Sequence, residues 1–155
     1  MQFREATIKD IDNYMIVRMA VKENVLNNLA LVTREDNVNY LSKYGKGWVC
    51  ETDRQIIGFA IVGSAQHNVW ALFVHPEFEE KGIGRKLHDL MIDWYFNQTN
   101  EKIWLGTQPK TKAEIFYRKR GWREVGMHGD DEIKFEMTFD DWREINRMKP
   151  EQSEF

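Results

Sequence analysis

Residues 72–87 read LFVHPEFEEKGIGRKL, and they carry the strongest structural signal in the chain. They continue an apolar run, Val69–Val74, that has almost no polar residue on either face. Such a run is typical of a central strand that is covered on both sides. Pro76 then ends the strand and stiffens the turn, and Gly82 and Gly84 open a helix. The stretch therefore predicts a buried strand that leads through a short loop into a helix.

The start of this predicted helix is a candidate anion site. The first N–H groups of a helix have no partner within it, and the helix dipole is positive at that end. Glycines let the backbone approach a bulky diphosphate closely, and Lys81, Arg85 and Lys86 would add positive charge. Two glycines at this spacing also fit a tightly packed helix start, and the three cations also fit a solvated one. A dinucleotide-binding fold is disfavoured, because the third glycine of G-x-G-x-x-G would fall at Leu87.

The composition limits the classes of protein to which the chain can belong. Its 155 residues fit one domain, and 22 basic against 25 acidic residues give a net charge of -3. This balance argues against a protein that coats nucleic acid or an anionic membrane, because both tasks need a basic excess. The single Cys50 excludes an intrachain disulfide and a metal cluster made only of cysteines. The four histidines have no H-x-x-x-H or H-x-H spacing, so no metal site is expected.

Two patterns bear on location. The N-terminus lacks a basic region followed by an apolar run, so no signal peptide is expected. The longest strongly apolar stretch, Ile56–Val62, is too short to span a bilayer. We therefore expect a cytoplasmic protein.

The remaining sequence alternates between strand and helix patterns, as in an α/β chain. Strands are predicted at residues 3–6, 48–51, 56–62, 69–74, 103–106, 122–125 and 133–139. Helices are predicted over residues 11–22, from Thr33 past Leu41, over residues 84–96 and over residues 111–120.

No repeat or linker divides the chain, so residues 1–140 are expected to form one domain. The tail, residues 141–155, is expected to belong to the same domain, as a short helix held on its body. Its apolar residues are Trp142, Ile145, Met148 and Phe155.

A second motif, Ala113–Trp122, lies about thirty residues after the first and predicts a short helix that ends at Gly121. Phe116 and Tyr117 are adjacent, so they cannot share one helix face. One of them can enter the core while the other lines a cleft. A tyrosine hydroxyl in a cleft can donate a proton at neutral pH, because its ordinary pKa is about 10. A core position with a satisfied hydroxyl is the alternative for Tyr117.

The two motifs together resemble the GNAT superfamily of N-acetyltransferases over most of the chain. The family has Gln/Arg-x-x-Gly-x-Gly/Ala after a strand that ends Val-His/Asp-Pro, and this chain has Val74-His75-Pro76 followed by Glu79-Glu80-Lys81-Gly82-Ile83-Gly84. The later signature appears as Ala113, Phe116-Tyr117 and Gly121-Trp122. The resemblance implies a GNAT fold, with a mixed central sheet of six to seven strands flanked by about four helices. Glu79 departs from the family's Gln or Arg, and we expect its carboxylate to point to solvent.

The resemblance also implies a donor and a mechanism. The donor would be acetyl-coenzyme A, with its pantetheine arm paired along the strand and its pyrophosphate on the amides of residues 81–85. A primary amine, from a small molecule or from a protein or peptide, would attack the thioester directly, with Tyr117 as general acid. The implied coenzyme-binding residues are Leu72, Phe73, Val74, Lys81, Gly82, Ile83, Gly84, Arg85, Lys86, Lys110 and Tyr117.

The general base and the acceptor cannot be identified from the sequence. His67, Glu51 and His128 are candidate bases by residue type, and water is a further candidate. His75 is interpreted as structural and His88 as exposed or capping. An acyl intermediate on Cys50 is disfavoured, since the cysteine lies in an apolar strand without a neighbouring base.

Three further expectations concern partners. A homodimer is expected by analogy with family members that pair through their final strands. Nucleic acid and membrane are not expected partners. A non-catalytic acyl-coenzyme A-binding module, or a partner-binding domain, on the same fold is the alternative function.

Overall fold

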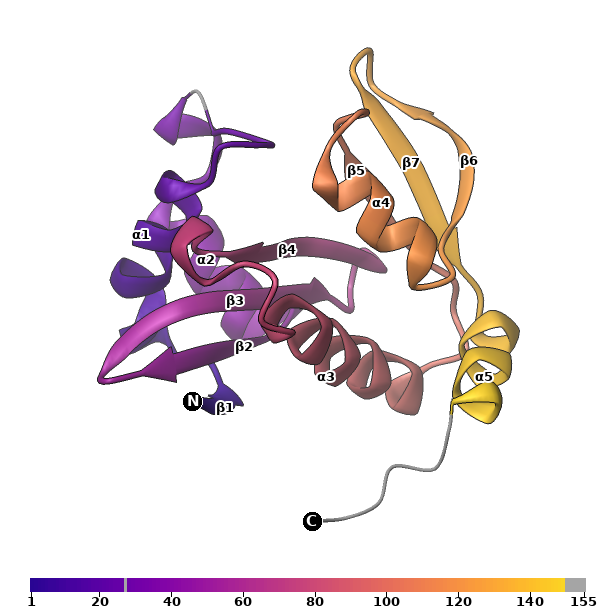
Figure 1. Cartoon of the computed structure of the whole chain (residues 1–155), viewed down its shortest axis with the longest axis horizontal. Helices are drawn as coiled ribbons and strands as arrows, with labels where there is room; N and C mark the ends of the chain where they lie inside the picture. The colour runs from indigo at the N-terminus through magenta and orange to yellow at the C-terminus, as the bar shows by residue number, and fades with distance from the viewer. Residues whose placement is uncertain (27, 150–155) are drawn as a thin grey trace.

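The computed structural model describes residues 1–26 and 28–149. Within them, seven strands form one mixed sheet in the order β1-β2-β3-β4-β5-β7-β6 (Figure 1). The strands are β1 Gln2–Glu5, β2 Gly45–Thr52, β3 Gln55–Gly63, β4 Asn68–Val74, β5 Ile103–Thr107, β6 Arg123–His128 and β7 Glu132–Met137. The α-helices of this part are α1 Ile11–Ala20, α2 Arg34–Asn39, α3 Ile83–Gln98, α4 Lys112–Lys119 and α5 Phe139–Met148.

The α/β architecture with a mixed sheet is confirmed, and every predicted strand is present with shifted ends. The strand predicted at 133–139 ends at Met137, because the Thr138 hydroxyl accepts the Asp141 N–H at 3.0 Å and so caps α5. The described residues therefore contain five α-helices, one more than the prediction of about four. The predicted tail helix is present as α5, and Phe155 lies outside the described residues.

Helices cover both faces of β3, the most buried strand. Ala60 and Val62 of β3 belong to the apolar cluster that includes Leu87 of α3. Phe59 belongs to a second cluster, which includes Tyr14 of α1, and the two rings stack at 4.4 Å. Successive strand residues point to opposite faces, so a strand covered by α3 on one face and α1 on the other is apolar throughout.

The helix α5 packs on α3 largely through a tryptophan. The Trp142 ring stacks on Phe96 at 5.4 Å, and its indole N–H donates to Asp93 at 2.9 Å. This contact fixes the C-terminal helix beside α3 (Figure 1). No helix of the described residues has both the length and the apolar content needed to cross a membrane.

Candidate functional site

The strands β4 and β5 run parallel and separate almost at once, leaving a wedge between them (Figure 1). The two strands are paired at Asn68 and Trp104. Beside this pair, the Trp104 N–H donates to the His67 carbonyl at 2.9 Å. The pairing of β4 with β3 shifts register so that Trp70 is an extra residue in β4. Such a bulge bends a strand, which accounts for the separation of β4 from β5.

The free edge of β4 carries backbone groups that point into the wedge. The His75 N–H donates to the Ile57 carbonyl of β3 at 2.8 Å. Backbone groups alternate in direction along an antiparallel strand, so those of Leu72 and Val74 point away from β3 and toward β5. An extended chain in the wedge could therefore pair with Leu72 and Val74. The backbone N–H and C=O groups of Phe73, by contrast, point to β3.

The start of α3 lies against the end of β4 and has free N–H groups. A Cβ placed on Gly84 would lie 3.5 Å from Val74 Cγ2. Gly82 is the N-cap with φ 81, no side chain caps the helix, and the Lys86 N–H bonds to the Gly82 carbonyl. The N–H groups of Ile83, Gly84 and Arg85 therefore have no partner within the helix. Nothing lies within 4 Å of a Cβ placed on Gly82, so a ligand can approach these groups.

The charged residues near this helix start are exposed, as an anion site requires. Lys81, Arg85 and Lys86 are all exposed. Lys110 is exposed in the turn before α4, at φ 62. Glu79, which was expected to point to solvent, is exposed, and its carboxylate pairs with the exposed Lys112 of α4 at 3.0 Å.

The segment that follows α1 reaches the end of β5. The Asn24 Oδ1 atom accepts the Gln108 N–H at 2.9 Å, just beyond β5. Glu23 accepts the backbone N–H of Lys112 at 2.9 Å, at the start of α4. Residues 23 and 24 thus contact the segment that runs from the end of β5 to the start of α4.

Tyr117 lies in the core on the α3 side of the sheet, and its adjacent residue Phe116 is only half-buried. Its ring packs edge-on against Trp122 at 5.7 Å, in the same apolar cluster as Leu72 and Val74. Burial raises the pKa of Tyr117, so the hydroxyl keeps its proton at neutral pH. Among the described residues the hydroxyl has no hydrogen-bond partner, and the side chain is 6% exposed.

His88 is buried, so the prediction that it is exposed or capping was wrong. Its side chain is 4% exposed, and its Nε2 accepts the indole N–H of Trp122 at 3.0 Å. An indole can only donate, so Nε2 carries no proton and Nδ1 holds it toward Asp89 at 2.9 Å. Burial lowers the pKa of His88. The prediction failed because Phe116 and Tyr117 of α4, and Trp122 after it, cover a helix position that looks peripheral in the sequence.

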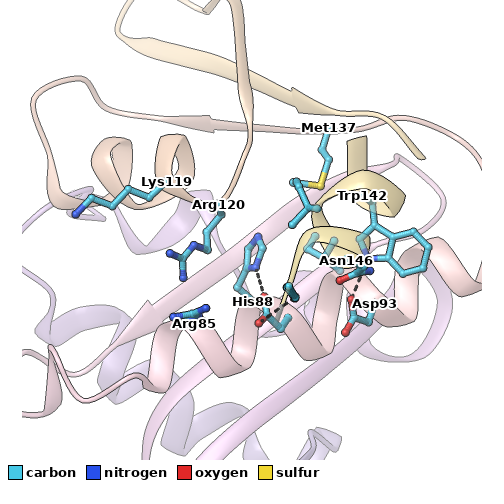
Figure 2. Close-up of a pocket in the computed structure, with 12 residues that line it drawn as sticks. Arg85, His88, Asp93, Lys119, Arg120, Met137, Trp142 and Asn146 are labelled. Carbon is cyan, nitrogen blue, oxygen red and sulfur yellow. Dashed lines mark hydrogen bonds and ion pairs between the residues drawn. The ribbon is translucent and has the colours of Figure 1, made fainter. Parts of the chain in front are cut away.

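His88 also lines a cavity of about 140 Å³ between α3, α5 and the end of α4 (Figure 2). Arg85, Lys119 and Arg120 lie on one side of this cavity, and Trp142 and Asn146 of α5 lie on the other (Figure 2). The cavity therefore adjoins the helix start described above.

The three candidate bases lie away from the helix start. His67 forms a hydrogen bond with the Tyr95 hydroxyl at 2.7 Å, at the closed end of the wedge. It precedes Val74 by seven residues, which is about 20 Å along an extended strand. Glu51 is paired with Arg4 at 3.0 Å at the opposite side of the sheet. The His128 ring packs at a tilt against Trp104, with the ring centroids 4.8 Å apart. None of them is close to the end of β4, so the structure singles out no base.

Cys50 does not offer an alternative nucleophile. Cys50 is fully buried in β2, and burial raises the pKa of its thiol, which disfavours the nucleophilic thiolate. Groups of three or more His, Cys, Asp or Glu side chains that could hold a metal ion are not found in this part of the chain.

The comparison with known families agrees with this geometry. The sequence matches the family described as "Acetyltransferase (GNAT) domain" over residues 43–124, which is more than half of the chain and includes both motifs. The chain belongs to the GNAT acetyltransferase family. The matched range of this GNAT domain contains the wedge strands β4 and β5, the start of α3 and Tyr117.

Solved GNAT structures share the fold at low sequence identity. A GNAT-family acetyltransferase of Staphylococcus aureus Mu50 superposes with a TM-score of 0.78 at 19% identity, covering 89% of this chain and 98% of that one. The PaiA N-acetyltransferase of Thermoplasma acidophilum gives 0.75 at 15% identity, with 88% and 98% covered. The ribosomal-protein-alanine N-acetyltransferase of Brucella melitensis gives 0.70 at 22% identity, with 89% and 99% covered. The mixed sheet of this GNAT domain is thus shared with enzymes of different names.

Proposed function

We propose that this GNAT domain transfers an acetyl group from acetyl-coenzyme A to a primary amine, by direct attack within a ternary complex. The observation that carries the proposal is the free edge of β4 beside the uncapped start of α3. An extended pantetheine arm fits the edge at Leu72–Val74, and a diphosphate fits the helix start. Two structural neighbours support this donor, since one was solved with coenzyme A and another, YncA of Salmonella typhimurium, with acetyl-CoA.

The proposed donor contacts follow from the geometry of the helix start. The N–H groups of Ile83, Gly84 and Arg85 would bind the diphosphate oxygens, and the φ of 81 at Gly82 keeps the approach open. Exposed Lys81, Arg85 and Lys86 would add attraction for the phosphates, and Lys110 would lie against the coenzyme from α4's side of the wedge. The list of donor contacts is completed by Leu72, Phe73, Val74, Gly82 and Tyr117.

The proposed chemistry needs polarisation of the thioester carbonyl and a proton for the departing thiolate. A backbone N–H on the free edge of β4, at Leu72 or Val74, would polarise the carbonyl. Tyr117 would protonate the thiolate, because a tyrosine whose pKa is raised remains a neutral acid at pH 7. Water would accept the amine's proton, since none of the candidate bases lies near the end of β4.

A thiol-release screen tests the proposal directly. Purified chain is mixed with acetyl-coenzyme A and a panel of primary amines, and free thiol and acetylated product are both measured. We expect release that depends on an amine. Tight acetyl-coenzyme A binding without turnover on any amine would favour the non-catalytic acyl-coenzyme A-binding module instead, and no binding would favour a partner-binding domain.

A further inference from the structure

Arg18 of α1 carries a buried nitrogen with no hydrogen-bond partner. Its Nη1 atom is enclosed and unpartnered within the described residues, one of only two such side-chain atoms there. The residue falls on the buried stripe of α1, one position after Val17 and four after Tyr14. A guanidinium presents five N–H donors, and a donor that is buried without an acceptor destabilises the fold. Such a group in a native structure calls for an explanation.

The contacts of Arg18 do not satisfy this donor. The guanidinium carbon lies 4.2 Å from the centroid of the Phe73 ring, which stabilises the cation through its flat face. The N–H groups lie in the plane of the guanidinium, so stacking leaves them free. No ion pair to Arg18 occurs among the described residues. Burial alone lowers the pKa of Arg18, which agrees with the absence of a nearby carboxylate.

Phe73 places Arg18 beside the wedge. Phe73 lies on β4 between Leu72 and Val74, the residues that offer their backbone to the wedge. Its side chain points to the α1 face of the sheet, and those of Leu72 and Val74 point to the α3 face. Arg18 is therefore at the wedge, on the face opposite to the start of α3.

The face on which Arg18 lies is the one left for the acceptor. The donor's diphosphate would occupy the α3 side, so an amine that attacks the thioester must enter from the α1 side. The segment after α1 lies beside the end of β5, because the Asn24 Oδ1 atom accepts the Gln108 N–H at 2.9 Å. An acceptor that enters here passes between that segment and β4, next to Arg18.

We propose that Arg18 binds a carboxylate of the acceptor, so that the substrate class is an amine that also carries a carboxylate. The inference rests on the proposed acetyl transfer and names its substrate. A carboxylate accepts two parallel N–H bonds from a guanidinium, and Arg18 as a whole residue is only half-buried. The carboxylate belongs either to a free amino acid or to an acidic side chain of a peptide, and both present the same chemistry to Arg18.

The first test uses the wild-type chain and acceptors in matched pairs. The pairs are 4-aminobutyrate against its amide, and the dipeptide Ala-Glu against Ala-Gln. Each pair keeps the amine nearly unchanged and removes one carboxylate. We expect kcat/KM to be about 10- to 100-fold higher for the carboxylate member of at least one pair, as a charged hydrogen bond contributes. The pair that discriminates identifies the source, free amino acid or acidic peptide.

The second test uses Arg18→Met, which keeps an apolar stem over Phe73 and removes the charge. We expect kcat/KM for the preferred carboxylate acceptor to fall about 10- to 100-fold, while that for its neutral partner and the affinity for acetyl-coenzyme A stay unchanged. Arg143→Met is the matched control, because Arg143 also stacks on an aromatic ring, Phe139 at 5.6 Å, but on α5. It should leave all three quantities unchanged.

The outcomes separate this inference from the proposed function. Equal kcat/KM within both pairs of the wild-type chain would overturn the role of Arg18 and leave acetyl transfer intact. In Arg18→Met, an equal loss of kcat/KM for the carboxylate acceptor and for its neutral partner would also overturn it. Such a loss would show that Arg18 supports the structure and does not bind the carboxylate. Turnover of no amine at all would overturn the proposed function and the inference with it.

Discussion

Gly82 is the residue on which the proposed diphosphate site depends most closely. Its φ of 81 lies in the left-handed region, and the space around its Cα is empty. Gly129, in the turn between β6 and β7, has the same two properties with φ 67. Gly82 is the N-cap of α3 and Gly129 lies in a hairpin turn, so Gly129 is a control for backbone strain outside the proposed site.

Gly82→Leu should weaken acetyl-coenzyme A binding by about tenfold or more, because the side chain would occupy the approach to the helix N–H groups. Gly129→Leu should leave binding unchanged. Both variants should lose about 1–2 kcal/mol of stability from the strained backbone. Calorimetric titration and thermal unfolding measure the two effects separately. Equal affinities for Gly82→Leu and Gly129→Leu would contradict the placement of the diphosphate.

Tyr117→Phe should lower kcat about 100-fold or more, with acetyl-coenzyme A affinity unchanged, because it removes the proposed acid and nothing else. The free energy of unfolding should change little, since the hydroxyl has no hydrogen bond to lose among the described residues. Steady-state kinetics beside calorimetric titration tests this split. A variant as fast as the wild-type chain would remove Tyr117 from the mechanism.

The helices α3 and α4 meet through charged and polar side chains that the sequence patterns did not pair. The His88–Trp122 bond joins α3 to the segment that follows α4. The Glu79–Lys112 pair joins the loop before α3 to the start of α4. The first contact leads to a prediction about stability, and the second to a prediction about coenzyme binding.

The buried His88 should make stability depend on pH. Its pKa is lowered from the ordinary 6.5, so the unfolded chain takes up the proton first as pH falls. The stabilising effect is therefore present above about 6.5 and is lost below it. Urea unfolding at pH 7.5 and 5.5 should show this loss in the wild-type chain and a flatter dependence in His88→Leu. At pH 7.5 that variant should be less stable by about 1–3 kcal/mol, because the Trp122 N–H is left unpaired.

Glu79→Gln should tighten acetyl-coenzyme A binding about two- to fivefold at low salt, because it removes a negative charge near the diphosphate. The gain should shrink at high salt. Glu101→Gln, beyond the other end of α3, is the control and should have no effect. Weaker binding in Glu79→Gln would mean that the Lys112 pair holds the site in its active shape.

The helices and strands differ in how well their bounds could be predicted from sequence patterns. The apolar run of β4 and the periodicity of α3 are local, so both were predicted close to their observed bounds. The Thr138 cap that separates β7 from α5 is also local but lies inside an apolar pattern, and it was missed. The side chain that enters the core from α4, Tyr117 or Phe116, depends on how α4 lies over the sheet, which adjacent residues cannot fix.

The candidate site divides in the same way. Its backbone part, the glycines and the helix start, follows from local sequence. Its side-chain part depends on tertiary contacts: His88 is covered by Trp122, and Arg18 meets Phe73 from 55 positions away in the chain. The sequence did contain one signal for this side of the wedge. It is the charged Arg18, which follows the apolar stripe of Ile11, Tyr14 and Val17.

At the scale of the whole molecule, β6 is the exposed edge of the sheet. All six of its residues are exposed, including Val125 and Met127. An open edge with apolar side chains favours pairing with another strand. Trp142 of α5 does not lie on this edge and packs on α3 of its own chain.

We predict a homodimer that pairs through β6. Light scattering should give the mass of two chains at assay concentration, and Val125→Lys should reduce it to one. Met19→Lys, on the exposed surface of α1, should leave the mass unchanged. A wild-type chain with the mass of a monomer would exclude this dimer.

The binding of the acyl donor in the wedge is the central claim, and a crystal of the chain soaked in acetyl-coenzyme A tests it most directly. We expect the pantetheine arm along Leu72–Val74 between β4 and β5, the diphosphate on the amides of residues 83–85, and the thioester within reach of the Tyr117 hydroxyl. An empty wedge, or a donor bound on another face of the molecule, would contradict the account.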